Sequence, residues 1–318
     1  MKKYKKLLLL FLIIVIFSCI IGPFIKILLD FLLVEKNILA ELVDYEGGAY
    51  DFGKVMRRIL MLSAVIAFIF FGRTLKVVTL ISSGIKLRNG FLRQFFLGFI
   101  LAATSLLIYY SLALLFGAWK IHIDYDSAGV IALNVIKYIL IGSFVGFIEE
   151  AFFRGFILQS FMEDMSMPIA VCSSSLIYSV LHFFRADTHV ATGFQAFVGF
   201  TTMMQFFKPL FLQFIKNLPS IIGLFLVGVV LSYAFIKTKS LYLSIGLHSG
   251  WIFMMKADSI FLVRIREKSG WLFGDSQIVT GFLVWGFLLC ILVIIKKIYS
   301  NTHNHGVNIN GENLKGTC

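Results

Sequence analysis

Charged residues are scarce in this sequence. Only 14% of the 318 residues are Asp, Glu, Lys or Arg, whereas 59% are hydrophobic and the mean hydropathy is +0.90. Soluble domains usually carry about 25% charged and about 45–50% apolar residues. A water-soluble fold is therefore excluded, because one core in water would not hide this many apolar side chains. The 4 prolines leave the apolar runs almost uninterrupted.

Cysteine is also rare, and acidic residues are outnumbered by basic ones. Cys19, Cys172, Cys290 and Cys318 have no paired spacing, which argues against a disulfide framework or a cysteine metal site. The net charge of +12 comes from Lys and Arg scattered between apolar segments, as is typical of membrane edges. We expect contact with the lipid bilayer and no nucleic-acid partner; the sequence indicates no particular oligomeric state.

What is present is a series of long apolar segments. A spanning helix needs about 20 mostly apolar residues, and continuous runs without alternation favour helices over a β-barrel. Eight candidates meet or approach this length: 7–29, 58–72, 94–117, 129–150, 168–184, 219–236, 240–255 and 278–295. We therefore predict an all-α, polytopic membrane helix bundle of about eight transmembrane helices.

The chain divides into three parts by composition. Residues 1–128 hold the first three helices and their loops, 129–299 form a second helical bundle, and 300–318 are a polar tail predicted to be disordered. Residues 185–218 are rich in Phe but interrupted by charges and prolines. We interpret them as a lateral amphipathic element, with a re-entrant segment or a ninth span as alternatives. Four lysines precede the first helix, which predicts a retained helix with the N-terminus in the cytoplasm.

Three charged residues stand inside one apolar helix. Residues 133–161 are predicted as one long helix, with Glu149, Glu150 and Arg154 near its middle. A charge at membrane depth costs at least about 2.5–3.5 kcal/mol, so such residues are rare and usually functional. Glu150 and Arg154 share a helix face and are predicted to pair. Glu149 is rotated by about 100° from Glu150 and is available to another partner, unless all three form one structural ion cluster.

Two of the six histidines are also predicted inside apolar helices, namely His182 and His248. A single intramembrane histidine is usually an interhelical hydrogen bonder. Two of them and a spare glutamate, on three separate helices, favour a shared polar site, because lipid solvates none of them. Neighbouring small residues such as Gly142, Gly146 and Gly250 predict close approach of these helices.

One carboxylate and two imidazoles in a polar cleft are suited to hydrolysis. Glu149 is predicted to deprotonate a water molecule, His182 to orient it, and His248 to donate to the oxyanion. The same set has the composition of a His₂Glu zinc site, although the chain has no His-Glu-x-x-His motif. We expect no cofactor, and keep a zinc ion bound by Glu149, His182 and His248 as the alternative. Neither serine nor cysteine catalysis is favoured, because the sequence has no Gly-x-Ser-x-Gly motif and no cysteine beside these histidines.

Three motifs occur in the order Glu149-Glu150-x-x-x-Arg154, Tyr178-x-x-x-His182 and a late His248. This order resembles the CAAX-protease and bacteriocin-processing family, also called the Abi family. The glycine-containing stretch from Gly223 onward is similar to that family's approach to its last motif. The resemblance covers about residues 130–255. It implies an eight-helix intramembrane endopeptidase whose first glutamate and two histidines are essential, with metal-free catalysis.

Through this resemblance we expect a multi-pass protein of a bacterial plasma membrane that cuts a membrane-embedded, lipidated or leader peptide. Two departures from the family pattern stand out. Tyr178 replaces the usual Phe, and Ile252 occupies the Asn position of the motif His-x-x-x-Asn, which removes one oxyanion donor. One alternative is therefore a non-catalytic membrane scaffold or bacteriocin-immunity protein with the protease fold. A proton-coupled transporter is disfavoured, because no internal repeat is apparent.

Overall fold

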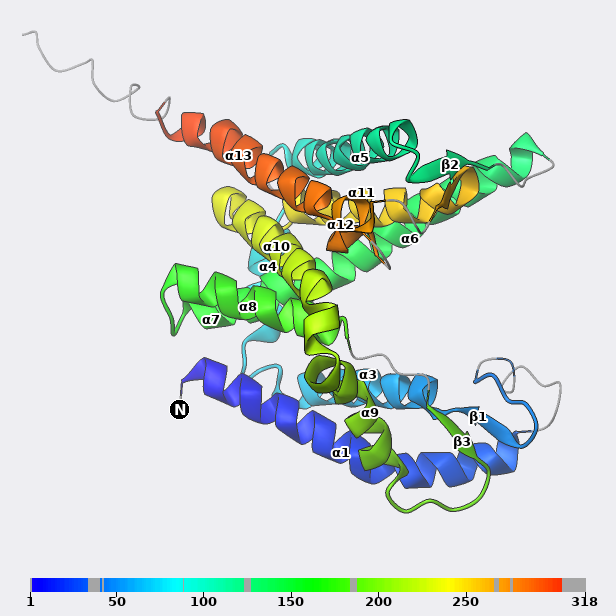
Figure 1. The fold of residues 1–318 in the computed structure, drawn as a ribbon. Coiled ribbons are helices and arrows are strands. Elements are labelled where there is room, and N and C mark those ends of the chain that lie inside the picture. Colours follow the sequence, from blue (N-terminus) through cyan, green and yellow to red (C-terminus); the bar gives the residue numbers. More distant parts are fainter. Residues whose placement is uncertain are drawn as a thin grey trace, which may run out of the picture.

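The fold is a bundle of helices with two short ribbons of strand (Figure 1). A computed structural model describes residues 2–33, 41, 43–87, 89–122, 127–183, 188–265, 269–274 and 277–304. Within them, helix predominates throughout, which confirms the predicted all-α membrane bundle. The predicted polar tail is helical up to Asn304, and its remainder, residues 305–318, lies outside the described part.

The long helices follow the predicted apolar segments closely. They are α1 (Lys3–Leu32), α3 (Phe52–Phe71), α5 (Phe91–Leu115), α6 (Ala128–Phe152), α8 (Met167–Leu181), α9 (Val198–Leu212), α10 (Phe214–Thr238), α11 (Tyr242–Phe261) and α13 (Phe282–Asn304). The shorter helical elements are α4 (Val77–Ile85), a π-helical turn (Phe153–Leu158), α7 (Gln159–Met162), α12 (Gly270–Phe273) and a 3₁₀ turn (Ile278–Thr280). Polar side chains begin two of the long helices: Asp51 accepts from the backbone N–H of Gly53, and Ser127 from that of Val130.

Five helical segments of the described chain are long and apolar enough to cross a membrane: Lys3–Leu32, Phe91–Leu115, Ala128–Met162, Phe214–Thr238 and Phe282–Tyr299. The other three predicted spans correspond to α3, α8 and α11. The first half of α3 carries three basic residues, α8 has only 15 residues, and α11 contains several polar ones. The total of eight spans therefore stays a prediction.

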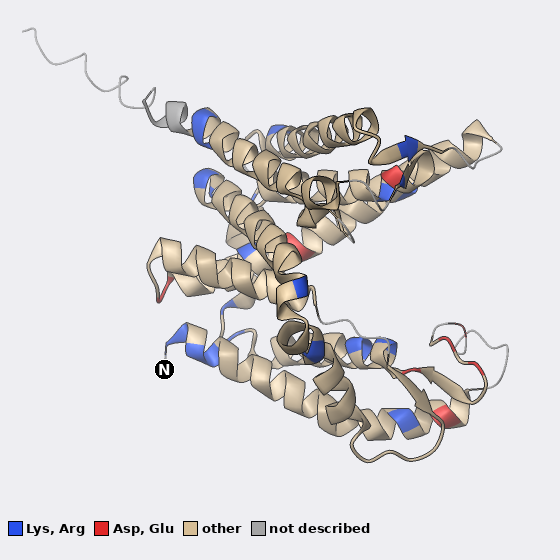
Figure 2. Cartoon of the chain, viewed as in Figure 1, with Lys and Arg blue, Asp and Glu red and all other residues tan. Residues whose placement is uncertain are grey.

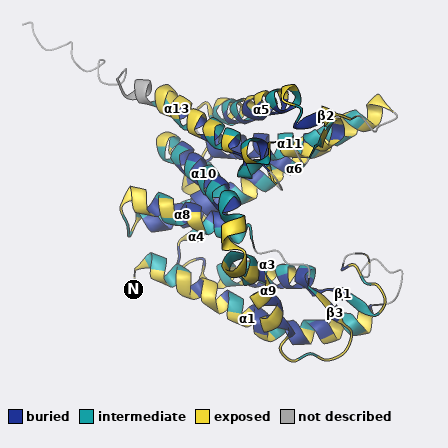
Figure 3. Ribbon diagram, viewed as in Figure 1, coloured by how far each residue is buried: buried dark blue, intermediate teal, exposed yellow. Residues whose placement is uncertain are grey.

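The surface of the bundle is that of a protein in lipid. Exposed residues run along the outer faces of the helices, and buried residues collect where helices meet (Figure 3). Many exposed side chains are large and apolar, such as Phe31 at 84% and Ile69 at 73% exposure. Lys and Arg lie mostly near helix ends and in connections (Figure 2). An apolar belt with charges at its margins is the pattern that a bilayer selects.

Two short antiparallel ribbons tie distant segments together. Strand β1 (Ala49–Asp51) pairs with β3 (His189–Ala191), and β2 (Trp119–Ile121) pairs with β4 (Leu262–Arg264). Each ribbon joins parts of the chain that are more than a hundred residues apart, so each fixes a long-range contact. The second ribbon holds the C-terminal end of α11 against the end of α5.

The N-terminal part is anchored by a buried ion pair that the sequence did not reveal. Lys26 of α1 is fully buried, and its ammonium donates to Asp30 Oδ2 at 2.8 Å and to the carbonyl of Gly193 at 2.6 Å. Tyr50 donates to the other oxygen of Asp30 at 2.8 Å. The region predicted as a lateral element, residues 185–218, contains β3 and α9. The loop between them contacts α1, because the buried Lys26 ammonium donates to the Gly193 carbonyl.

Candidate active site

Helix α6 crosses α11 closely, at a point where both helices carry small residues. A side-chain carbon at Gly146 would lie 2.7 Å from Ser249 Oγ, and one at Gly142 would lie 2.8 Å from the Ser249 carbonyl oxygen. Neither position therefore has room for a larger residue. The close approach predicted from the small residues is confirmed for α6 and α11, and it sets the last turns of α6 against the middle of α11; Gly250 instead faces Phe99 of α5.

This crossing brings Glu150 to His248 as well as to Arg154. Glu150 and Arg154 are fully buried, with Arg154 Nη1 2.7 Å from Glu150 Oε1. The same Oε1 lies 2.9 Å from Nδ1 of His248. Arg154 Nη2 donates to the carbonyl of Gly228 on α10 at 3.2 Å. The predicted ion pair is therefore confirmed, and it is one part of a buried chain that links α6, α10 and α11.

The contact with Glu150 defines the hydrogen-bonding state of His248. A carboxylate that already accepts from a guanidinium has only lone pairs to offer, so Nδ1 of His248 is the nitrogen that donates. The other nitrogen, Nε2, then accepts in the neutral ring and donates in the imidazolium. It lies 3.8 Å from Glu149 Oε2, which is longer than a direct hydrogen bond.

Glu149 has a different environment from its neighbour. Its side chain is 30% exposed, whereas that of Glu150 is fully buried. Glu149 Oε2 is itself buried and accepts no hydrogen bond from any described residue. The rotation of about 100° between successive helical residues explains the contrast, because it turns Glu149 out of the ion pair and into a cavity.

His182 lies where α8 ends, rather than within the helix as the segment 168–184 predicted. The helix stops at Leu181, and the His182 N–H bonds the Ser179 carbonyl at 3.2 Å in a tighter final turn. Nδ1 of His182 lies 2.8 Å from the Tyr178 carbonyl oxygen. Because a carbonyl only accepts, Nδ1 donates, and Nε2 of the neutral ring is an acceptor.

The Tyr178 ring forms the wall between these groups. Its centroid lies 4.4 Å from that of the His182 ring and 6.2 Å from that of the His248 ring. The guanidinium of Arg154 lies 4.8 Å from the same ring, at cation–π distance. Tyr178 is fully enclosed at 2% exposure, so one aromatic ring sets the spacing of three charged or polar side chains.

The helix that carries the glutamates is not uniform. The predicted single helix over 133–161 is helical throughout, but a π-helical turn at Phe153–Leu158 interrupts its α-helical hydrogen bonding. Gln159 donates from Nε2 to the carbonyls of Gly155 at 2.7 Å and Leu80 at 2.8 Å, which occupies acceptors beside that turn. Turns of this kind occur often at functional sites, where an extra residue redirects the following side chains.

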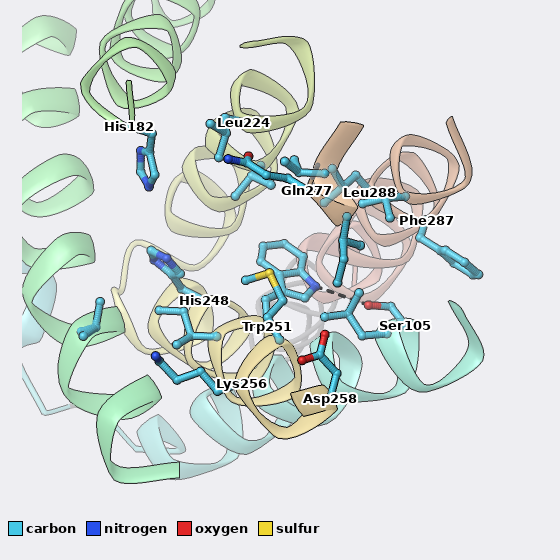
Figure 4. Close-up of a pocket in the computed structure, with 18 of the residues that line it drawn as sticks. Ser105, His182, Leu224, His248, Trp251, Lys256, Asp258, Gln277, Phe287 and Leu288 are labelled. Atoms are coloured by element: carbon cyan, nitrogen blue, oxygen red, sulfur yellow. Dashed lines mark hydrogen bonds between the residues drawn. The ribbon is translucent and has the colours of Figure 1, made fainter. Parts of the chain in front are cut away.

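Four of these residues, Glu149, Tyr178, His182 and His248, line one cavity of about 1150 Å³. In the close-up view, His182 and His248 project into the same space from different helices (Figure 4). Glu149 and Tyr178 line it as well. Most of the remaining wall is apolar and comes from α10, α11 and α13, with Leu224, Val227 and Phe287 as examples. The structure therefore joins the three predicted site residues; their roles in catalysis stay predictions.

Other polar residues of the cavity were missed. Lys256 and Asp258 line it, although their segment was interpreted as a loop after a span ending at 255. Helix α11 continues to Phe261, because the ribbon between β2 and β4 supports its C-terminal end. Asp258 accepts a hydrogen bond from Tyr110 at 2.7 Å. The available signal was the four-residue spacing of His248, Ile252 and Lys256, which places them on one face.

The predicted zinc alternative has no support in the side-chain arrangement. Among the residues that the structure describes, no group of three His, Cys, Asp or Glu side chains lies close enough together to hold a metal ion. Nδ1 of His248 is already committed to Glu150. Its Nε2 lies 3.8 Å from Glu149 Oε2.

The fold and this cavity define the class of the protein: an integral membrane protein that encloses an acid–histidine site among its helices. Residues 131–254 match the family model described as Type II CAAX prenyl endopeptidase Rce1-like. That segment contains every predicted site residue, and the match is consistent with the resemblance to the CAAX-protease and bacteriocin-processing family. Members of this family are membrane proteases. The searches found no matching curated protein and no matching solved structure.

Proposed function

We propose that this protein is an intramembrane endopeptidase in which Glu149 activates the attacking water. The observation that carries the proposal is the difference between the two adjacent glutamates. Glu150 is fully buried and bonded to Arg154 and His248 through Oε1, whereas the Glu149 side chain is 30% exposed and lines the cavity. A general base must be reached by the water that it activates, and of the two carboxylates only that of Glu149 belongs to a partly exposed side chain that lines the cavity.

The hydrogen-bond directions give each histidine a separate part. Water donates one hydrogen to Glu149 and the other to Nε2 of neutral His182, so that its oxygen lone pair faces the substrate. Attack forms the C–O bond while Glu149 takes the proton. The negative oxygen of the tetrahedral intermediate is stabilised by Nε2–H of protonated His248. Glu149 then returns its proton to the amine as the C–N bond breaks.

Glu150 and Arg154 serve as positioning residues in this scheme. The carboxylate of Glu150 holds the His248 ring in place through Nδ1. Arg154 donates to Glu150 and also bonds the carbonyl of Gly228 on α10. No metal is required by these roles.

The substrate class follows from the family description and the cavity wall. A largely apolar cavity is suited to a hydrophobic or lipid-modified peptide segment, and the matching family acts on CAAX prenyl peptides. We propose a membrane-embedded, lipidated or leader peptide as substrate. Bacteriocin maturation is one process that supplies such leader peptides.

The proposal is tested by reconstituting the purified protein in liposomes with two sets of peptides. One set carries an S-farnesylated cysteine followed by two aliphatic residues and a variable last residue; the other carries a hydrophobic leader segment. Mass spectrometry should show paired products whose summed mass exceeds the substrate by one water. Glu149→Gln protein should form none. A wild-type protein that binds these peptides without cutting any would instead identify a scaffold or immunity protein with a protease fold.

We further propose that the protein lies in a bacterial plasma membrane with its N-terminus on the cytoplasmic side. The four lysines at the N-terminal end, of which three lie in the first turns of α1, support this orientation. A cysteine-labelling experiment with a membrane-impermeant reagent at position 2 is the direct check: labelling of intact cells would reverse the orientation.

A further inference from the structure

One stripe of α11 carries both catalytic and unassigned residues. His248, Ile252 and Lys256 are spaced by four residues, and all three line the cavity. Side chains at this spacing lie one above the other on a helix. Lys256 lies two residues beyond the segment that matches the family, so the match assigns it no part.

The charge of Lys256 is not neutralised by the protein. Among the described residues, no carboxylate lies within 4.0 Å of its ammonium, and that ammonium donates no hydrogen bond. Asp258 is only two residues further on, but it accepts from Tyr110 of α5. In the close-up view Lys256 and Asp258 leave α11 in different directions (Figure 4). Arg264 also lines the cavity, with its guanidinium above the Trp119 ring. This part of the cavity wall therefore carries two basic side chains and one acidic side chain, Asp258.

The spacing of His248 and Lys256 along α11 sets how many residues of a bound peptide would separate the two side chains. Eight residues of helix at 1.5 Å per residue separate His248 from Lys256 by about 12 Å along the helix axis. An extended peptide advances about 3.3 Å per residue. A substrate whose scissile carbonyl lies at His248 would therefore present its third or fourth neighbouring residue to Lys256.

We propose that Lys256 forms a carboxylate-binding subsite, which holds an acidic group of the substrate three to four residues from the bond that is cut. This inference rests on the proposed peptidase function. Lys256 is an exposed residue that lines a mostly apolar cavity, and its ammonium, which has no partner among the described residues, is complementary to one negative group. The group is a carboxylate, either that of the peptide C-terminus or that of an Asp or Glu side chain. Lys256 thus determines which peptides are selected and in which direction they lie.

The test measures binding, so that it does not depend on cleavage. The probes are three fluorescent S-farnesylated peptides: Cys-Val-Ile-Met with a free C-terminus, the same peptide as its amide, and the amide of Cys-Val-Ile-Glu. Each is titrated by anisotropy against full-length Glu149→Gln protein in nanodiscs. At least one carboxylate-bearing probe should bind about tenfold more tightly than the neutral amide, as expected for a charge-assisted hydrogen bond. The probe that gains identifies the source of the carboxylate.

Substitutions then assign the preference to one side chain. Lys256→Met, in the same Glu149→Gln background, should bring the ratio of dissociation constants close to one. Lys256→Glu should reverse it, in favour of an amide ending in Lys. Lys137→Met is the matched control, because Lys137 is exposed on α6 and does not line the cavity; it should keep the tenfold ratio.

The outcomes separate this inference from the proposed function. An unchanged ratio in Lys256→Met, or no binding of any probe, overturns the subsite. A Lys256-dependent preference in a wild-type protein that cuts no peptide supports the subsite and overturns the peptidase. Peptide cleavage without a Lys256-dependent binding preference supports the peptidase function and overturns the subsite.

Discussion

The ring of His248 is bonded to Glu150 and not to Glu149. Its Nδ1 lies 2.9 Å from Glu150 Oε1, whereas its Nε2 lies 3.8 Å from Glu149 Oε2. The two adjacent carboxylates therefore act on opposite sides of one imidazole: the first faces the cavity, and the second holds the ring from behind.

Replacing Glu149 by Gln should remove activity without unfolding the protein. The substitution keeps the size of the side chain but removes the base, which is worth about 10²–10⁴-fold in rate. Because Glu149 takes no part in the buried ion pair of Glu150 and Arg154, we expect the free energy of unfolding to change by less than about 0.5 kcal/mol. Peptide cleavage and thermal unfolding in detergent measure the two effects. Glu163→Gln, at an exposed site outside the cavity, is the control, and activity surviving in Glu149→Gln would refute the base.

Replacing Arg154 by Ala should instead destabilise the protein. It leaves Glu150 buried without its cation, which costs about 3–5 kcal/mol, and it removes the bond to Gly228. We expect a lower unfolding temperature and less protein in the membrane. Arg58→Ala changes an exposed arginine and should have little effect. Equal stability of both variants would contradict the structural role of the pair.

Replacing Tyr178 by Phe should preserve function. The ring supplies the contacts with Arg154, His182 and His248, and the family usually has Phe at this position. We expect cleavage within about threefold of wild type. Tyr178→Ala removes the ring and should cost about 3–5 kcal/mol of stability, as for other buried aromatic residues. If Tyr178→Phe alone abolished cleavage at normal stability, the hydroxyl would have a chemical role.

Replacing Ile252 by Asn should increase activity. Ile252 faces the cavity one turn from His248, at the position where the family commonly has Asn. A second donor to the oxyanion is worth up to about 3–4 kcal/mol when fully aligned, so we expect kcat to rise by about tenfold or more. Ile252→Leu keeps the volume without the donor and should show no gain. A matching gain in the leucine variant would attribute the effect to packing.

Chelation should leave the activity unchanged. The proposed roles use carboxylate and imidazole groups alone, so protein purified in mild detergent should cut its substrate equally with and without a strong chelator. Elemental analysis of the same preparation gives its metal content. Stoichiometric zinc whose removal stops cleavage, and whose return restores it, would replace the metal-free mechanism while leaving the three site residues in place.

The sequence alone determined the class of the protein and indicated the residues of the candidate site. The apolar runs fixed the helices, since a bilayer leaves a chain no other way to satisfy its backbone. The charges of Glu149, Glu150 and Arg154 inside one run marked the site, because buried charge is costly wherever it occurs. The pairing of Glu150 with Arg154 followed from local helix geometry. Each of these inferences depends on neighbours in sequence or on a property of the solvent.

Only the tertiary structure decided which groups meet across helices. Glu150 contacts His248, which is 98 residues away in the sequence. This contact requires α6 and α11 to pack closely, which the contact of Gly146 with Ser249 allows. The position of Lys256 in the cavity depends on α11 continuing past residue 255, which the ribbon between β2 and β4 supports. The burial of Lys26 depends on a carbonyl at Gly193 that returns to α1. Helical periodicity gives the face of a side chain, but the register between two helices is set by packing of many side chains at once.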